Sequence, residues 1–170
     1  MEETLAVQAE FLKQFPGVVE ARVQRARRIF ASVPSIDFVR VFNHVVGPMG
    51  FTILCTITGL DKGQSLGAIY HLARPSGVTV SLETSVPKDN PVLQTISHIF
   101  PAADLAEREL IDLFGMKVEG LPPGNRYPLP EGWPAGQFPL RKDWNAEVLN
   151  AAFPTTSPTS PTPEAPDEKV

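Results

Sequence analysis

The hydrophobic positions follow two different periods along the first 120 residues. Apolar residues recur every three or four positions in 2–14 and 35–46, which predicts two amphipathic helices, the second beginning at Ser35 and ending before Gly47-Pro48. A further short helix is expected over 91–99. β-Branched or alternating segments predict strands at 18–23, 51–59, 66–72 and 77–84. This order favours an α+β fold, a two-layer domain with a mixed, mostly antiparallel sheet packed on helices.

The segment ADLAERELIDLFG at 103–115 has the clearest helical pattern. Asp104 and Glu107 have the spacing of a capping box, and Gly115 stands where a left-handed C-terminal residue is needed. The pattern predicts a helix over 104–114 that closes a domain spanning 1–119. Arg108 and Asp112 have the spacing of a surface ion pair.

Proline and glycine dominate the chain after this helix. Residues 120–153 contain too many of them for a helix or a long strand, yet they include Tyr127, Trp133, Phe138 and Trp144. This favours an extended arm that docks on a partner. Residues 154–170, rich in Pro, Ser and Thr, lack the apolar content needed for a core, so a disordered tail is expected.

Composition and charge exclude several classes of protein. The chain has 170 residues and a net charge of −4, which does not suit a general nucleic-acid binder. Its single cysteine cannot form a disulfide scaffold or hold an iron–sulfur cluster. Cys55 is expected to be a small buried hydrophobe. The acidic N-terminus and the short apolar segments indicate neither a signal peptide nor a membrane span. Four arginines at 22, 25, 27 and 28 indicate either an acidic partner or a solvated face.

Three histidines, His44, His71 and His98, stand in no recognisable catalytic pattern. Glu109 and Asp112 share a helix face, so a small stand-alone enzyme that uses them together with His71 is one alternative. A module that binds partners through the proline-rich tail is another. A stand-alone enzyme would turn over by itself and lose activity on Glu109→Gln.

Two spaced motifs resemble those of a known family. The run ERELIDLFG at 107–115 is similar to the signature of the 30-kDa subunit family of respiratory complex I. The later PLRKD at 139–143 resembles the motif that closes the same family's domain. Between them, Arg126 and Trp133 occupy positions like that family's arginine and tryptophan, and Asp61 is similar to its aspartate.

The resemblance implies a non-catalytic subunit in the peripheral part of a membrane complex, on the cytoplasmic side of the inner (cell) membrane. Its partners would be a large catalytic subunit and a small iron–sulfur subunit. This chain itself would bind no cofactor, and a [NiFe] centre and iron–sulfur clusters would lie in those partners. The family signature and expected subunit interface comprise Glu107, Arg108, Glu109, Asp112, Gly115, Arg126, Trp133, Pro139, Leu140, Arg141, Lys142 and Asp143.

Departures from the respiratory pattern favour one branch of the family. Leu105 stands where a tryptophan is usual, and residues 121–126 replace the usual basic run. We therefore expect the version found in energy-converting, membrane-bound [NiFe] hydrogenases, with the respiratory NADH:quinone oxidoreductase as the alternative.

Overall fold

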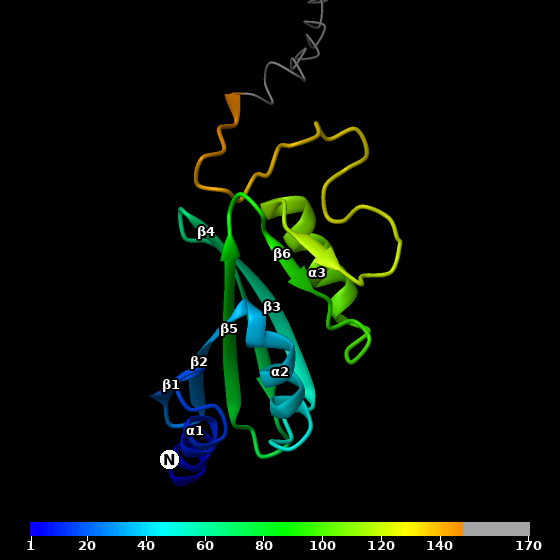
Figure 1. The fold of residues 1–170 in the computed structure, drawn as a ribbon. Coiled ribbons are helices and arrows are strands. Elements are labelled where there is room, and N and C mark those ends of the chain that lie inside the picture. Colours follow the sequence, from blue (N-terminus) through cyan, green and yellow to red (C-terminus); the bar gives the residue numbers. More distant parts are fainter. Residues whose placement is uncertain (148–170) are drawn as a thin grey trace, which may run out of the picture.

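The computed structural model describes residues 1–147 and consists of one large sheet, one small sheet and helices on one side (Figure 1). The elements follow in the order α1 (Glu2–Gln14), β1 (Glu20–Arg25), β2 (Arg28–Pro34), η1 (Ser35–Asp37), α2 (Phe38–Val46), β3 (Ile53–Asp61), β4 (Ser65–Ala73), β5 (Thr79–Pro87), β6 (Val92–Gln94), α3 (Ala103–Phe114) and β7 (Lys117–Glu119).

The large sheet has the strand order β1-β2-β5-β4-β3. The pairs β1–β2, β3–β4 and β4–β5 are antiparallel, whereas β2 pairs with β5 in parallel. The small sheet is the parallel pair β6–β7. The predicted mixed, mostly antiparallel α+β fold is therefore confirmed.

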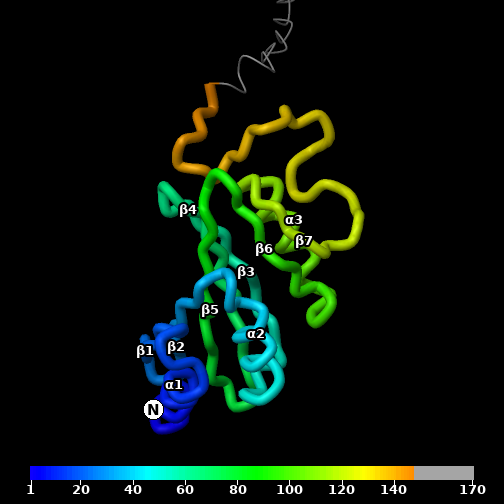
Figure 2. Tube along the Cα trace, viewed as in Figure 1, coloured from blue at the N-terminus to red at the C-terminus, as the bar shows by residue number. Residues whose placement is uncertain are grey.

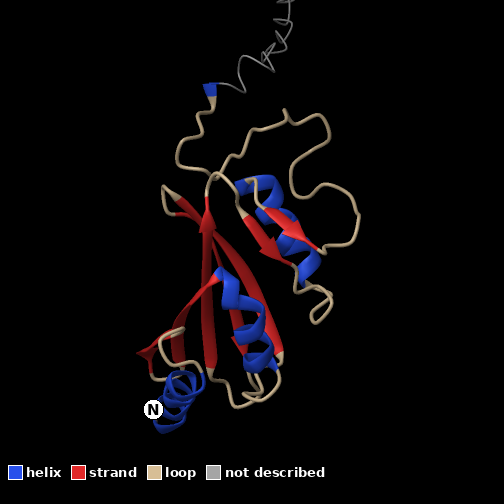
Figure 3. Ribbon diagram, in the orientation of Figure 1, coloured by secondary structure: helices blue, strands red, loops and turns tan. Residues whose placement is uncertain are grey.

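The core lies between the helices and one face of the large sheet. Phe38 and Phe42 of α2 pack on Tyr70 of β4, with ring centroids 4.6 and 5.6 Å apart. Gly59 of β3 lies against Leu110 and Phe114 of α3, where any Cβ would collide with both side chains. Because Gly59 pairs with Ala68, and Ile57 with Tyr70, α2 and α3 lie on the same face of the sheet (Figure 3).

The structure corrects several local predictions. Residues 91–99 form β6 and turns rather than a helix, because Val92 and Leu93 pair with the distant β7. The strand β2 was not predicted, and Ser35 begins the short η1 turn instead of capping α2. The strand β3 is an edge strand with exposed threonines, and Cys55, at its bulge, is exposed rather than buried.

The arm follows β7 and has no helix or strand between residues 120 and 144 (Figure 3). It runs past α3 and returns to the end of the sheet near the β3–β4 turn (Figure 2). The predicted tail, 154–170, lies outside the described residues. Within residues 1–147, no helix is long and apolar enough to cross a membrane.

Candidate functional site

Glu107 lies on the inner face of α3 and is fully buried. Its carboxylate accepts hydrogen bonds from the Thr95 hydroxyl and, at 2.7 Å, from the backbone N–H of Ile96. Burial raises the pKa of Glu107, while these two hydrogen bonds oppose that rise. The predicted capping box is wrong, because α3 begins after Ala102 and no side chain caps its N-terminus. Glu107 instead holds the turn that follows β6 against the helix.

Two further charged residues of α3 hold the arm. Asp112 accepts a hydrogen bond from Arg126 Nε at 3.0 Å and from the backbone N–H of Leu129 at 3.3 Å. Arg108 donates to the backbone carbonyl of Pro122 at 2.8 Å and pairs with Asp104 one turn earlier. The predicted Arg108–Asp112 pair is therefore wrong, since each residue has a different partner.

Gly115 lets the end of the arm pack flat on the end of α3. Its φ of +67° is the left-handed conformation that was expected, which glycine adopts without a steric cost. A Cβ at this position would lie 2.5 Å from the Phe138 ring. The Arg141 guanidinium lies over that ring, 4.5 Å from its centroid, and donates to the Phe114 carbonyl at 2.6 Å. The backbone N–H of Leu140 donates to the Leu113 carbonyl at 3.1 Å.

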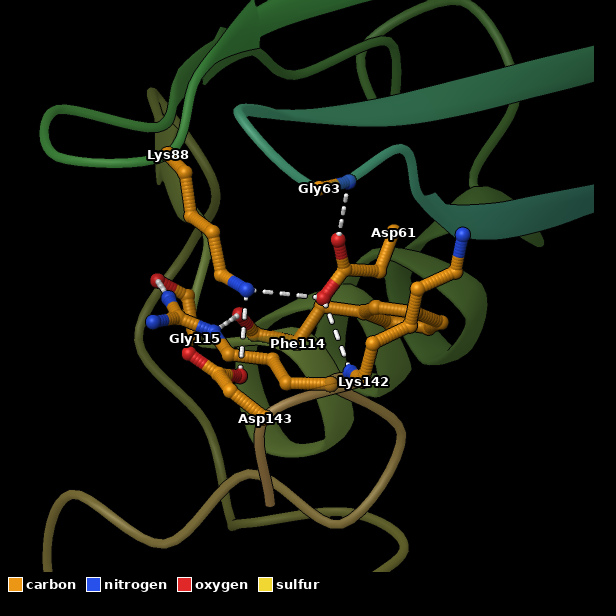
Figure 4. A network of polar contacts seen from close by, with 8 residues as sticks. Asp61, Gly63, Lys88, Phe114, Gly115, Lys142 and Asp143 are labelled. Carbon is orange, nitrogen blue, oxygen red and sulfur yellow. Dashed lines mark hydrogen bonds and ion pairs between the residues drawn. The ribbon is translucent and has the colours of Figure 1, made fainter.

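Asp61, at the end of β3, is the acceptor that holds the arm at Lys142 (Figure 4). Its carboxylate accepts hydrogen bonds from the backbone N–H of Gly63 at 2.7 Å, from Lys88 Nζ at 2.9 Å and from the backbone N–H of Lys142 at 2.9 Å. Lys88 also pairs with Asp143 at 3.0 Å. The Lys88 hydrogen bond is the largest cause that lowers the pKa of Asp61 to about 2.

This network joins residues 81 positions apart in the sequence. No local pattern in the sequence indicated Lys88, and the resemblance to the family was the only signal for Asp61. The reason is that the partners of Asp61 come from a turn and from the arm, far away in the sequence.

The aromatic residues of the arm pack against one another. Trp133 and Trp144 are stacked with ring centroids 6.5 Å apart. Both indole N–H groups donate to Gln137, one to its backbone carbonyl at 2.8 Å and the other to its side-chain oxygen at 3.1 Å. The second half of the arm is therefore a folded loop with its own small cluster.

The predicted interface residues thus fall into two groups. The larger group makes contacts within the chain and comprises Glu107, Arg108, Asp112, Gly115, Arg126, Trp133, Arg141, Asp143 and the Lys142 backbone. Leu140 is 52% exposed, and Glu109 is partly exposed. Leu105 of α3 and Tyr127 of the arm, which were not in the predicted set, are exposed as well. Pro139 directly precedes Leu140 in the same segment.

The structure does not bring together the residues of the stand-alone enzyme hypothesis. Asp112 and Glu109 belong to α3, on the helix-covered side of the sheet. His71 alternates with Tyr70 along β4 and therefore points to the other face, where it bonds to Ser81 and Thr58. Among residues 1–147, no group of three or more His, Cys, Asp or Glu side chains is placed to hold a metal ion.

The fold and this arm define a recognisable class of protein. Residues 31–148 match the family model of the respiratory-chain NADH dehydrogenase 30-kDa subunit. The chain therefore belongs to this family, as its two motifs indicated.

Curated relatives come from several complexes. The chain is 40% identical over 87 residues to the beta subunit of the membrane-bound hydrogenase of Pyrococcus furiosus, a match that covers 49% of this chain and only half of that subunit. It is 30% identical to the C subunit of the F420H2 dehydrogenase of Methanosarcina mazei, over 77% of this chain and 85% of that protein. The J subunit of the chloroplastic NAD(P)H-quinone oxidoreductase of Lemna minor is 32% identical over 64% of this chain and 70% of its own length.

Solved structures agree with these relatives. A chain in the structure of the membrane-bound sulfane sulfur reductase, an archaeal respiratory membrane complex, superposes with a TM-score of 0.76 at 25% identity and 98% coverage of both chains. The trypsin-resistant fragment of Nqo5 gives a TM-score of 0.61 at 25% identity, over 71% of this chain and 99% of the fragment.

Proposed function

We propose that this chain is a non-catalytic subunit of a membrane-bound energy-converting hydrogenase. It lies in the peripheral, cytoplasmic part of the complex and docks the large [NiFe] subunit beside a small iron–sulfur subunit. The chain supplies no redox centre and supports electron transfer, coupled to ion translocation, by holding its partners in place. The hydrogenase subunit of Pyrococcus furiosus, with the highest identity of the three curated relatives described above, supports this choice.

One observation carries the docking role. Several polar groups of the arm, such as those of Arg126, Trp133 and Arg141, are bonded within the chain. Large apolar side chains on α3 and the arm are exposed instead: Leu105 is 56%, Tyr127 40% and Leu140 52% exposed. Aromatic and aliphatic anchors are the residues that dominate stable protein interfaces. The Asp61 and Asp112 contacts fix the arm in advance, which lowers the entropic cost of binding.

Substitution of one anchor tests this role. Leu140→Asp in a tagged chain should remove the large subunit from the purified complex and leave the isolated chain folded, because Leu140 is already half exposed. Ile36→Asp is the matched control, since Ile36 is 91% exposed on η1, an element that does not belong to the arm or α3. Equal assembly of both variants would contradict docking through the arm.

Truncation tests the arm as a whole. A chain ending at Gly120 should fail to assemble, whereas a chain ending at Glu147 should assemble. Recovery of the large subunit with the shorter chain would overturn the proposal.

A second candidate is the equivalent subunit of a dehydrogenase, including the respiratory NADH:quinone oxidoreductase. The longer match to the F420H2 dehydrogenase protein favours this candidate. Identification of the large subunit that co-purifies decides between the two. Two CxxC motifs in that subunit indicate a [NiFe] site, since thiolates are the expected ligands of nickel, and their absence indicates a dehydrogenase.

A further inference from the structure

Within residues 1–147, the helices α1, α2 and α3 all lie on one face of the large sheet and leave its second face uncovered. Residues Ile29, Ala31 and Val33 of β2 point into the core, so Arg28, Phe30 and Ser32 point to the opposite, open face. Cross-strand partners share a face, and the pairing places Arg22, Phe30, Ser81, His71 and Thr56 in one row across all five strands. The neighbouring row begins with Arg25 and Arg28.

Three arginines gather at the β1–β2 corner of this open face. Arg22 lies over the Phe30 ring, 5.0 Å from its centroid. Arg25 and Arg28 stand directly opposite each other in the hairpin register. We call Arg22, Arg25, Arg28 and Phe30 the arginine corner.

The arginine corner is electrostatically unbalanced. Like charges directly opposite on two strands are destabilising. Across residues 1–147, no carboxylate lies within ion-pair distance of these three arginines. Glu20 is the exposed acid on the same face, and Glu83 in its row is already paired with Lys62. Burial first, and then the charge of Arg28, lower the pKa of His71.

The corner is also held rigidly. The Thr4 hydroxyl of α1 donates to the Ala26 carbonyl at 2.6 Å, and the backbone N–H of Thr79 donates to the Arg27 carbonyl at 2.9 Å. Both bonds fix the two-residue turn between the strands. A surface fixed in this way loses little conformational freedom when a partner binds.

We propose that the arginine corner is a second docking surface, which binds a carboxylate-bearing segment of another protein subunit. Guanidinium groups bind carboxylates through two parallel hydrogen bonds, and Phe30 supplies an apolar contact between them. The net charge of the whole chain is −4, which favours a local acidic protein partner over general attraction to an anionic membrane. This inference rests on the proposed role in a complex and adds the chemistry of one partner surface.

Zero-length cross-linking of the purified membrane complex tests it. Arg22→Lys, Arg25→Lys and Arg28→Lys each introduce an amine, and a carbodiimide joins an amine to a carboxylate only when the two are in contact. At least one variant should form a link, absent from the wild type, to an Asp or Glu of another subunit. The natural pair Lys88–Asp143, 3.0 Å apart, is the internal control for the reaction. Arg40→Lys should link only to its own Asp37, with which Arg40 pairs at 2.7 Å.

A second measurement separates binding from stability. Arg25→Gln removes the repulsion between Arg25 and Arg28, so the isolated chain should melt at the same or a higher temperature. The same variant should dissociate from the complex at a lower salt concentration. At a salt concentration at which the wild-type chain stays bound, the amount of Arg25→Gln chain bound to the complex should be about tenfold lower. Arg40→Gln should not change that retention.

Each outcome is decisive. If the Lys88–Asp143 link forms and the chain co-purifies with its partners, but no variant forms a link to another subunit, the proposal for the arginine corner is wrong and the proposed function is unaffected. Links only to Glu164, Asp167 or Glu168 of the same chain overturn it in favour of an internal partner. The proposal is also wrong, in favour of a lipid ligand, if the wild-type chain sediments with vesicles containing about one quarter phosphatidylglycerol and Arg25→Gln does not. Failure of the wild-type chain to co-purify with any subunit overturns the proposed function itself.

Discussion

The domain and the arm are stabilised by different interactions. The domain buries phenylalanines and aliphatic residues between its helices and one face of the sheet. Many contacts therefore contribute to its free energy of unfolding. The arm from residue 120 onward is attached by a few hydrogen bonds to Asp61, Asp112 and the end of α3. Loss of one contact should therefore weaken the domain globally but open the arm locally.

The largest effect is expected from Phe42→Ala in α2. Phe42 is buried against Phe38, Tyr70 and Phe100, and its truncation leaves a cavity that should cost about 3–5 kcal/mol of unfolding free energy. Urea unfolding measures this loss. Val39→Ala on the same helix is the control and should cost less than about 1 kcal/mol, because Val39 is 40% exposed. Similar losses in both variants would contradict a core centred on Phe42.

Glu107 gives a smaller effect that depends on the substitution. Glu107→Ala leaves the Thr95 hydroxyl and the Ile96 N–H without their buried acceptor and should cost about 2–3 kcal/mol. Glu107→Gln can accept from Ile96 and pair with Thr95 without a buried charge, so its stability at neutral pH should equal or exceed the wild type. A stability loss in Glu107→Gln as large as in Glu107→Ala would show that the charge itself is required.

Asp61→Asn should loosen the arm with a smaller change in the domain. The amide binds Lys88 less strongly, since it carries no charge, and roughly 1–2 kcal/mol of arm attachment should be lost. Limited proteolysis should cut residues 120–144 faster, while the melting temperature of the domain stays close to the wild type. A matched fall in melting temperature would mean that arm and domain unfold together.

Acid should also release the arm before the domain. The pKa of Asp61 is about 2 in the folded chain against an ordinary value of 3.8, so its contribution is complete above pH 3.8 and disappears as pH falls through about 2. The contribution of Glu107 to folding stability depends on pH in the opposite direction. Because its pKa is raised in the folded chain, this contribution is present below pH 4.5 and is lost as pH rises through the pKa of the folded state. Hydrogen exchange between pH 5 and pH 2 should show early loss of protection at Lys142. Simultaneous loss of protection in α3 would contradict this order.

The smallest effect is expected at the exposed pair Arg40–Asp37. The guanidinium side chain is 56% exposed, and such pairs contribute little. Asp37→Asn, which leaves Arg40 over the Phe15 ring, should change the free energy of unfolding by less than about 0.5 kcal/mol, measured by urea unfolding at low and high salt. A larger, salt-sensitive loss would show that the pair belongs to a wider network.

Local patterns in the sequence predicted the elements that depend on local contacts. The helices α1 and α3 and the left-handed Gly115 follow directly from apolar spacing and from glycine, and all three are confirmed. The family was also predicted correctly, because the two motifs at 107–115 and 139–143 are specific.

The errors share one physical cause, which is pairing between distant segments. Arg28–Pro34 becomes β2 because β5 supplies a parallel partner, and Val92–Gln94 becomes β6 because β7 does. Glu107 has the spacing of a cap, but burial on α3 decides its orientation. The contact of Asp61 with Lys142 exists only once the arm has crossed the domain, so no local pattern could reveal it.

The parallel pairing of β2 with β5 has a consequence for synthesis on the ribosome. The strands β3, β4 and β5 form a local meander, whereas β2 must wait until Thr79–Pro87 has emerged before it gains its neighbour. Until then the β1–β2 hairpin has an unpaired edge, and its repelling arginines help to keep that edge from pairing with other nascent chains. We therefore expect the same charges to oppose aggregation of the unfinished chain.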